Sequence, residues 1–387
     1  MGSRFLVIGA GFSGSVLANK LVNSLDCRIE IWDERSHVAG NCFTKRDEQT
    51  QVMVHQYGPH IFNTDKKEIW DFVNGFVKFF PYVHRVKARS GDAVYSLPVN
   101  LHTINQFFNK TFSSSEAIQF LDSLADKSIT NPQNFEEQAL RFIGRGLYDA
   151  FFYGYTKKQW GCEPTELPAS ILKRIPVRFT YDDRYHSNPF TGIPMEGYTA
   201  LIEKLVVHPF ISISLNRKFV SGMNVTEYDH VFFTGPLDAY FNYRYGRLGY
   251  RTVTFEKGYA DGDYQGGAQV NYCDLNFPFT RITEHKHFAP WEEHSRTVYF
   301  KEFSKETREE DVPYYPKRLK IDMGLLKLYR AEAEKLHKIS FLGRLATYRY
   351  MDMHQVIGEA LDFAKNFVAS YKVNHPPPVF SNIEPYE

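Results

Sequence analysis

Three glycines near the N-terminus have the spacing of a dinucleotide-binding turn. Gly9, Gly11 and Gly14 follow the apolar run Phe5–Ile8, and Ser15–Leu25 then shows the apolar spacing of a helix. In such a turn the first glycine allows a sharp bend, the second lets the backbone approach a pyrophosphate, and the third lets helix and strand pack closely. Free N–H groups at the helix N-terminus would hold the anion.

An acidic residue follows the next predicted strand. This second strand, Cys27–Trp32, follows the helix and ends in Asp33. A dinucleotide-binding fingerprint has an acidic residue about 20 residues after its glycines, where it hydrogen-bonds a ribose hydroxyl. An ordinary strand–turn–helix without a ligand is the alternative, because single glycine-rich turns are common. The combined pattern favours a bound dinucleotide.

The residues after Asp33 indicate which dinucleotide is bound. Glu34 and Arg35 lead into a second small-residue turn, Ala39-Gly40. This segment resembles the E-R-x-x-x-x-G-G segment of amine-oxidase-type flavoproteins, with Ala39 in place of the first glycine. We therefore predict FAD rather than NAD as the cofactor.

Composition limits the possible functions. The 387 residues include 46 Lys and Arg against 45 Asp and Glu, so the net charge of +1 gives no electrostatic reason to expect nucleic-acid binding. Four scattered cysteines without a C-x-x-C pair indicate reduced thiols and a cytoplasmic protein. The first strand begins within a few residues of the N-terminus, which leaves no room for a signal peptide, and no apolar run reaches the length of a membrane span.

The predicted elements describe an α/β protein with a discontinuous Rossmann-like domain. Strand–glycine–helix patterns occur at both ends of the chain, which places 1–80, 208–240 and 335–372 in one FAD-binding domain. We expect a helical substrate domain over 100–178 and a tail over 373–387. An antiparallel sheet domain is expected from 81–99, 179–207 and 241–334.

Several individual elements can be predicted as well. We expect a helix over Lys67–Phe80, a hairpin within Tyr82–Leu97 and a capping box from Ser113 and Glu116. The helix that starts near Glu136 should be interrupted at Gly144 and Gly146.

Six later segments share the signature of one enzyme family. They are Gly154–Gly161, Ile175–Phe179, Tyr250–Thr252, Thr280–Phe288, Pro313–Pro316 and Gly343–Tyr350. In this order they resemble segments of the bacterial UDP-galactopyranose mutases, a family that includes dTDP-fucopyranose mutase. One such segment would be weak support, but six in order are specific. The similarity runs from the first glycine motif to about residue 370.

A nucleotide-sugar needs a platform for its base, partners for its diphosphate and a polar sugar pocket. Aromatic rings can stack on the base, arginines can hold phosphates through bidentate, permanently charged contacts, and tyrosines add neutral donors. Any single arginine is more often a surface residue, so this expectation depends on the set. The resemblance implies that Arg174 and Arg281 are catalytic, lying nearest the diphosphate and the flavin. The predicted substrate-binding residues are Asn63, His84, Phe151, Phe152, Tyr155, Thr156, Trp160, Arg174, Tyr185, Arg251, Arg281, Tyr315 and Tyr350.

The glycine turn and the family resemblance together imply the FAD contacts. We predict no metal. The predicted cofactor-binding residues are Gly9, Gly11, Phe12, Ser13, Gly14, Asp33, Glu34, Arg35, Gly40, Asn41, His60, Ile61, Gly343, Arg344, Tyr350, Asp352 and Met353.

The resemblance implies a redox-neutral isomerisation of a nucleoside-diphosphate hexopyranose to its furanose form, for cell-surface polysaccharide such as lipopolysaccharide. N5 of reduced FAD would attack the anomeric carbon and displace the nucleotide, while arginines keep the leaving diphosphate close. The chain has no second dinucleotide fingerprint, so external NAD(P)H or a reductase should supply electrons. A homodimer is expected.

Other functions share some of these sequence features. A flavin oxidase of the amine-oxidase type would use the same cofactor domain but would not need the arginines, and a non-enzymatic binding module would need no turnover. His285 and His287 could ligate zinc, although strand histidines that line a pocket are commoner. Gly11-Phe12-Ser13-Gly14 lacks the G-x-S-x-G frame of a hydrolase.

Two positions depart from the family pattern. Most members have histidine where this chain has Asn63, and asparagine where it has His84. Both should face the sugar, so the exchange changes its donors and acceptors. Two compensating changes in one pocket are the alternative interpretation. UDP-galactopyranose is the expected substrate, because it is the usual substrate of the family that the chain resembles. A 6-deoxy sugar such as dTDP-fucopyranose is the leading alternative, because the loss of a C6 hydroxyl would require a rearranged contact of this kind.

Overall fold

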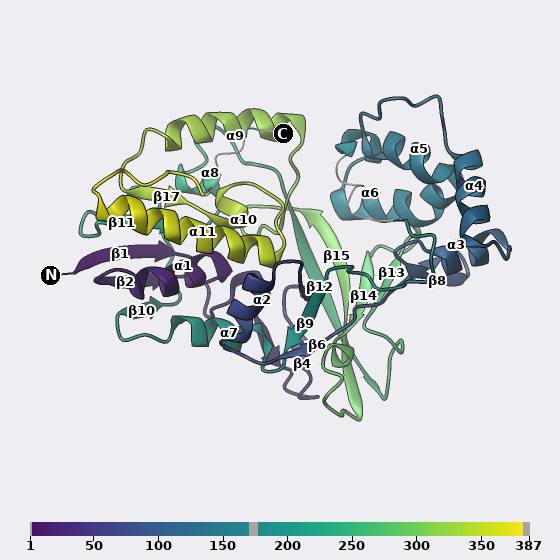
Figure 1. Ribbon diagram of the computed structural model, residues 1–387, viewed down its shortest axis with the longest axis horizontal. Helices are drawn as coiled ribbons and strands as arrows, with labels where there is room; N and C mark the ends of the chain where they lie inside the picture. Colours follow the sequence, from purple (N-terminus) through teal and green to yellow (C-terminus); the bar gives the residue numbers. More distant parts are fainter. Residues whose placement is uncertain (1, 170–176, 382–387) are drawn as a thin grey trace.

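A parallel sheet forms the part of the molecule that contains the N-terminus (Figure 1). The computed structural model describes residues 2–169 and 177–381. In the described chain the strand order is β10-β2-β1-β11-β17, and every pairing is parallel. The carboxyl ends of these strands therefore lie at one edge, where open α/β sheets bind ligands. The strands are β1 (Ser3–Ile8), β2 (Cys27–Trp32), β10 (Ile211–Ser214), β11 (His230–Phe233) and β17 (Ile339–Phe341).

Helices cover both faces of this sheet. Alternate side chains of β1 enter two hydrophobic clusters: Phe5 packs in the cluster with α1 (Phe12–Val22), and Leu6 packs in the cluster with α9 (Lys320–Ala333). Burial on both faces explains why β1 is a continuous apolar run. The other helices on these faces are α2 (Lys67–Asn74), α7 (Gly197–Val206), α8 (Leu237–Tyr240), α10 (Gly343–Ala346) and α11 (Met353–Lys372).

A second, seven-stranded sheet lies between the parallel sheet and a group of helices (Figure 1). Its order is β16-β12-β15-β14-β13-β7-β8. The predicted antiparallel character is confirmed for every neighbouring pair except β13 and β7, which are parallel. The strands are β7 (Val86–Ser90), β8 (Ala93–Leu97), β12 (Tyr250–Asp261), β13 (Gln269–Tyr272), β14 (Arg281–Glu284), β15 (Arg296–Glu306) and β16 (Tyr315–Pro316).

Helices α3 to α6 form the helical part. Ser113 and Glu116 make the predicted capping box at the start of α4. The predicted break at Gly144 is confirmed, since this residue has a φ of 71° and any Cβ there would lie 2.6 Å from the Leu124 carbonyl oxygen. Gly146 does not interrupt the helix. The elements are α3 (Leu101–Phe108), α4 (Ser114–Leu124), α5 (Phe135–Tyr148), the π-helical turn η2 (Asp149–Tyr153), α6 (Gly154–Trp160) and the 3₁₀ turn η3 (Pro164–Glu166).

The helix predicted over Lys67–Phe80 is wrong in its second half. α2 ends at Asn74, and Phe79–Pro81 instead forms β6, which pairs with β9 (Phe190–Pro194). Strand pairing and burial of Phe79 outweigh the helical spacing there. The remaining short elements are η1 (Gly40–Cys42), β3 (Thr44–Arg46), β4 (Met53–His55), β5 (Phe62–Thr64) and η5 (His285–Phe288).

Two segments expected in the sheet domain pack on the parallel sheet instead. α7 joins the cluster around α1, and α9 joins the cluster on the opposite face. In the domain division that we propose, both therefore belong with the nucleotide-binding domain. None of the helices within 2–169 and 177–381 is long and apolar enough to cross a membrane.

Candidate active site

Two neighbouring cavities contain most of the predicted site residues that the structure describes. The first cavity has a volume of about 880 Å³ and lies at the carboxyl ends of β1, β2 and β11. Its lining includes all of the predicted cofactor-binding residues except Gly14 and Gly343. This is the edge at which open α/β sheets bind their ligands.

The glycine turn has the close contacts that its spacing predicts. Gly9 has a φ of 109°, and a Cβ on Gly14 would lie 2.1 Å from the Gly9 carbonyl oxygen. A Cβ on Gly40 would lie 3.4 Å from the Cα of Gly11, so the two small-residue turns meet. Gly343 has a similar role, because a Cβ there would lie 2.2 Å from Ser13 Oγ. Gly14 and Gly343 therefore permit packing behind the cavity wall.

Asp33 is buried and fixes the end of β2. Its carboxylate accepts hydrogen bonds from the backbone N–H groups of Ala10 at 2.8 Å and of Arg35 at 2.9 Å. Each oxygen keeps a further lone pair for a ligand hydroxyl. Ala39, where flavoproteins of this type have glycine, has a φ of 74°.

Arg344 has unsatisfied donors. Its Nε and Nη2 atoms are buried and have no hydrogen-bond partner, and its guanidinium lies 4.9 Å from the ring centroid of Tyr315 and 4.6 Å from that of Tyr350. Arg35 Nη1 is also buried without a partner. Because unpaired buried donors are costly, these arginines are suited to an anionic ligand in the first cavity.

A second cavity of about 1,470 Å³ meets the first. Tyr155 and Trp160 on α6 line the second cavity. Four predicted substrate residues line both cavities and so mark their junction. These junction residues are Tyr185, Arg281, Tyr315 and Tyr350.

Arg281 is held by a carboxylate that the sequence did not reveal. Its Nε and Nη2 atoms lie 2.8 and 2.7 Å from Oε2 of Glu302, whose side chain is 1 % exposed. Burial alone would lower the pKa of Arg281, but the Glu302 carboxylate raises it above its ordinary value. The cation is therefore permanent and fixed in direction. Glu302 is an inward-facing residue of β15 with no motif around it, and only the cross-strand pairing with Arg281 reveals it.

Two of the junction tyrosines, Tyr185 and Tyr315, have raised pKa values and stay protonated. Burial raises the pKa of Tyr315 to about 12 and also raises that of Tyr185. The Tyr315 and Tyr350 rings stack with centroids 5.8 Å apart. Neutral phenols beside a fixed cation form a suitable set of donors for phosphate oxygens.

Asn63 and His84 both line the first cavity, as expected for residues that face one ligand. Asn63 Oδ1 accepts a 2.7 Å hydrogen bond from Asn188. His84 is buried, its Nδ1 has no partner, and burial lowers its pKa to about 3. Sequence reasoning missed His186, which stacks on His84 and lines the same wall.

Among the predicted substrate residues that the structure describes, four lie outside the lining of both cavities. Phe151, Phe152 and Thr156 are buried, and both phenylalanines pack in the helical core, where the Phe151 ring lies 5.0 Å from that of Tyr95. Aromatic content alone could not separate core rings from base platforms. Their contact with a base stays a prediction.

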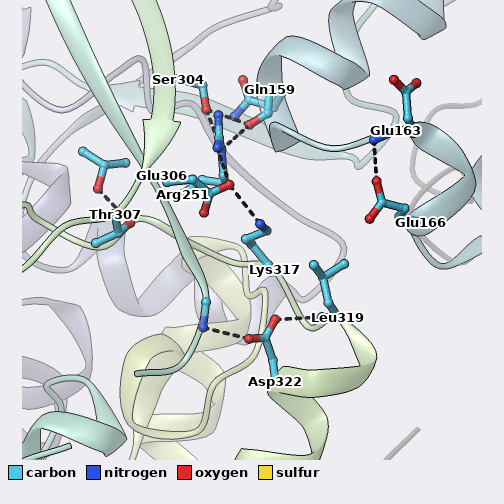
Figure 2. Close-up of polar contacts among 12 residues, drawn as sticks. Gln159, Glu163, Glu166, Arg251, Ser304, Glu306, Thr307, Lys317, Leu319 and Asp322 are labelled. Atoms are coloured by element: carbon cyan, nitrogen blue, oxygen red, sulfur yellow. Dashed lines mark hydrogen bonds and ion pairs between the residues drawn. The ribbon is translucent and has the colours of Figure 1, made fainter. Parts of the chain in front are cut away.

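The fourth, Arg251, is engaged within the protein. Its Nε donates to the Gln159 carbonyl at 3.0 Å and to Ser304 Oγ at 3.1 Å, and its Nη1 lies 2.7 Å from Glu306 (Figure 2). Nη2 donates to the Lys158 carbonyl at 3.3 Å. These contacts attach α6 to β12 and β15. Arg174 lies outside the described residues.

The two histidines weighed as zinc ligands do not come together. His285 is buried beside His55, whereas His287 lies near Asp263 and Glu284, with donor atoms within 4.8 Å of one another. The Lys286 ammonium is 2.5 Å from Asp263 and neutralises it. This arrangement is an ionic network at the end of the sheet, outside the lining of both cavities.

The fold and the two joined cavities define a Rossmann-type protein whose nucleotide-binding edge opens into a second cavity. Comparison with known proteins identifies the family. The model of the NAD(P)-binding Rossmann-like domain matches residues 7–76, and the UDP-galactopyranose mutase model matches residues 150–350.

Curated relatives cover nearly the whole chain. A probable UDP-galactopyranose mutase of Klebsiella pneumoniae is 54 % identical over 98 % of both chains. The dTDP-fucopyranose mutase of Escherichia coli is 49 % identical over 96 % of this chain and all of its own. A solved structure of reduced UDP-galactopyranose mutase has a TM-score of 0.74 at 15 % identity, covering 95 % of this chain and 96 % of its own, which supports the fold. The chain belongs to the UDP-galactopyranose mutase family, and it is an isomerase of the pyranose mutase class.

Proposed function

We propose that the protein uses FAD to interconvert a nucleoside-diphosphate hexopyranose and its furanose form. The observation that carries the proposal is the junction of the two cavities. There the fixed Arg281 cation and three tyrosines lie between a wall built from the Rossmann glycines and a wall built from α6. A cofactor in the first cavity and a nucleotide in the second would meet beside these residues.

The residues that line the first cavity are chemically suited to bind FAD. The glycine turn gives a backbone surface free of Cβ atoms, the Asp33 carboxylate has lone pairs for a ribose, and Arg344 has two unpaired donors. When bound and reduced, FAD would supply the nucleophile for the anomeric carbon. The chemistry demands no side-chain nucleophile, and the protein contributes position and charge.

The residues at the junction would keep the diphosphate in place during the reaction. Arg281 can bind a phosphate through N–H groups that point away from Glu302, and the phenols of Tyr185, Tyr315 and Tyr350 can donate to further oxygens. Holding the displaced nucleotide near the sugar favours its return to the anomeric carbon. Arg174 would share this role.

The sugar is proposed to be galactose, with UDP-galactopyranose as the substrate and dTDP-fucopyranose as the specific alternative. The names of the two relatives support both. Asn63 and His84 are the residues that should decide, since both line the first cavity and His84 offers an unpaired ring nitrogen. A hydroxyl that meets no partner, or a partner that meets no hydroxyl, is strongly disfavoured in a buried pocket.

The proposal extends to the cellular setting. It includes an external electron donor such as NAD(P)H or a reductase, a homodimer, a cytoplasmic location and a furanose product for cell-surface polysaccharide. The family resemblance supports these points except the location, which rests on the scattered, unpaired cysteines.

A competition assay tests the choice of sugar. Dithionite-reduced enzyme would be given UDP-galactopyranose and dTDP-fucopyranose together, and the furanose products would be separated by chromatography. We expect a preference for UDP-galactopyranose in kcat/KM. A preference of about 100-fold or more for the 6-deoxy substrate would overturn the assignment, because polar mismatches discriminate at least that strongly. Furanose from neither substrate would overturn the proposed activity.

A further inference from the structure

Lys158 makes an unusual set of contacts for a helical lysine. Its Nζ lies within hydrogen-bond distance of four main-chain carbonyl oxygens, those of Tyr272 at 2.7 Å, Asp274 at 2.8 Å, Phe277 at 3.1 Å and Phe279 at 3.0 Å. All four belong to residues 272–280, which we call the 272–280 connection because they join β13 to β14. An ammonium has three N–H groups, so the four oxygens surround it as they would surround a bound cation.

The 272–280 connection leads directly to the cation at the cavity junction. Thr280 is fully buried, its backbone N–H donates to the Glu302 carbonyl at 2.8 Å, and the next residue is Arg281. The position of Arg281 therefore depends on where this connection ends. Four carbonyl dipoles that converge on one point would repel one another without a cation between them.

The same ammonium also fixes α6, which carries two residues of the second cavity. Gly154 packs so closely on the connection that a Cβ there would lie 2.3 Å from the Cys273 carbonyl oxygen. Tyr155 and Trp160 line the cavity from this helix. Tyr155 and Arg281 line the same cavity, so this helix and the cation face each other across it.

Arg251 holds the other side of the helix. It donates to the Lys158 and Gln159 carbonyls, and Ser304 donates to the Gln159 carbonyl at 2.6 Å (Figure 2). α6 is therefore attached to β12 and β15 through its carbonyl groups, and to the 272–280 connection through a side chain. Without Lys158 the first attachment would remain and the second would be lost.

We propose that Lys158 is a positioning residue that holds α6 and the 272–280 connection at a fixed separation, and so sets the distance between the Tyr155–Trp160 wall and Arg281. This inference rests on the proposed function of the site, which it deepens. Lys158 acts through Arg281 and α6 and touches neither cofactor nor substrate in this account.

The neighbouring lysine is a matched control. Lys157 lies on the same helix but faces solvent, with its side chain 37 % exposed and paired with Glu163 at 2.5 Å. Lys158→Met and Lys157→Met remove one charge each from adjacent positions and keep the length of the side chain. With reduced enzyme we expect Lys158→Met to lower kcat/KM by about 10- to 100-fold, since a small misplacement of binding groups can cost about 100-fold. Lys157→Met should stay within about twofold of the unmodified protein.

Chemical rescue separates positioning from a general loss of stability. Lys158→Ala removes three methylene groups and the ammonium, and n-propylammonium replaces these atoms. Its addition should restore the turnover of Lys158→Ala in a saturable way and should leave that of Lys158→Met unchanged, because the methionine side chain occupies the space that the amine would need. Near wild-type turnover in Lys158→Met, or no restoration of a folded Lys158→Ala by the amine, would overturn the proposal.

Hydrogen exchange measured by mass spectrometry gives a test that needs no substrate. Peptides from 272–280 and from α6 should exchange faster in Lys158→Met than in Lys157→Met, while peptides from β1 and α1 should be unchanged. Equal exchange in the two variants would contradict the proposal even if the assumed substrate is wrong. If Lys158→Met does not fold, Lys158→Gln, whose amide keeps two donors, is compared with Lys157→Gln in the same way.

Discussion

The two cavities are built in different ways. One wall of the first is formed by the glycine turn, by Asp33 and by the turn at Gly40, which come within the first 41 residues. The junction with the second cavity is formed by side chains from Tyr185 to Tyr350, brought together by strand pairing and loops. The first depends on backbone shape and close packing, whereas the second depends on one fixed cation and its neighbours. The two parts should therefore fail in different ways when they are changed.

The largest effect is expected at the junction. Arg281→Ala removes the cation that is proposed to hold the diphosphate, and loss of such a donor costs about 2.7–4 kcal/mol, or about 100- to 1000-fold in rate. FAD content should be unchanged, because the glycine turn is intact. Turnover of the reduced variant and its flavin absorbance would be measured together. Arg296→Ala, which removes an exposed arginine of the same sheet, is the control. Near wild-type turnover in Arg281→Ala would contradict a catalytic role for Arg281.

A change behind the wall of the first cavity should act on cofactor binding and stability before it acts on chemistry. A Cβ at Gly14 would lie 2.1 Å from a backbone oxygen, so Gly14→Ala must open the turn. We expect a loss of roughly 1–3 kcal/mol in the free energy of unfolding, together with weaker FAD retention. Gly324→Ala is the control, because it adds a Cβ to open space within α9. Full FAD retention and unchanged unfolding in Gly14→Ala would contradict the close packing described here.

Acid should weaken the wall that carries His60 and His84. Burial lowers their pKa values to about 4 and about 3, below the value of about 6.5 in an unfolded chain. Between the folded and the unfolded pKa values the unfolded chain binds more protons than the folded protein. The contribution of these histidines to the free energy of unfolding is therefore fully present above pH 6.5 and decreases as the pH drops toward 4. Thermal unfolding from pH 7.5 to 4.5 would measure this fall. His84→Asn should make the fall shallower and His337→Asn, at an exposed site, should not. Equal slopes in the two variants would contradict the assignment.

The smallest effect concerns the second small-residue turn. Ala39 has a φ of 74°, and a non-glycine residue in the left-handed region costs roughly 1–2 kcal/mol. Glycine loses roughly 0.5–1 kcal/mol more conformational freedom on folding, so Ala39→Gly should stabilise the protein by roughly 0.5 kcal/mol. Gly40→Ala should act in the opposite direction, because Gly40 has a φ of 51° and lies against Gly11. Chemical denaturation would measure the free energy of unfolding of both variants. A lower free energy of unfolding in Ala39→Gly would contradict the claim that the left-handed conformation of Ala39 is strained.

The contacts of the glycine turn are easier to predict from sequence than the contacts of Arg281, for a physical reason. Gly9 and Gly14 meet backbone requirements that lie within a few residues along the chain, and Asp33 contacts Ala10 within one strand–helix–strand unit. The pairing of Arg281 with Glu302 depends on the register of β14 against β15, which local pattern does not fix.

The predicted elements show the same limit. β2 was predicted at its observed bounds, because buried apolar residues alternate with Arg28 and Glu30 along its length, which is the spacing of a strand. The end of α2 was missed, since Phe79 is held by β9 from a distant part of the sequence. Phe151 and Phe152 could not be recognised as core residues, because aromatic side chains serve cores and ligand sites alike.

The most direct test of the central claim compares the two redox states of one preparation. Purified protein would be assayed for conversion of UDP-galactopyranose to its furanose form, first as isolated under air and then after reduction by dithionite without oxygen. The account predicts a yellow protein with bound FAD that turns over only when reduced, with no net consumption of reductant per product formed. Equal turnover in the oxidised and the reduced protein would contradict it.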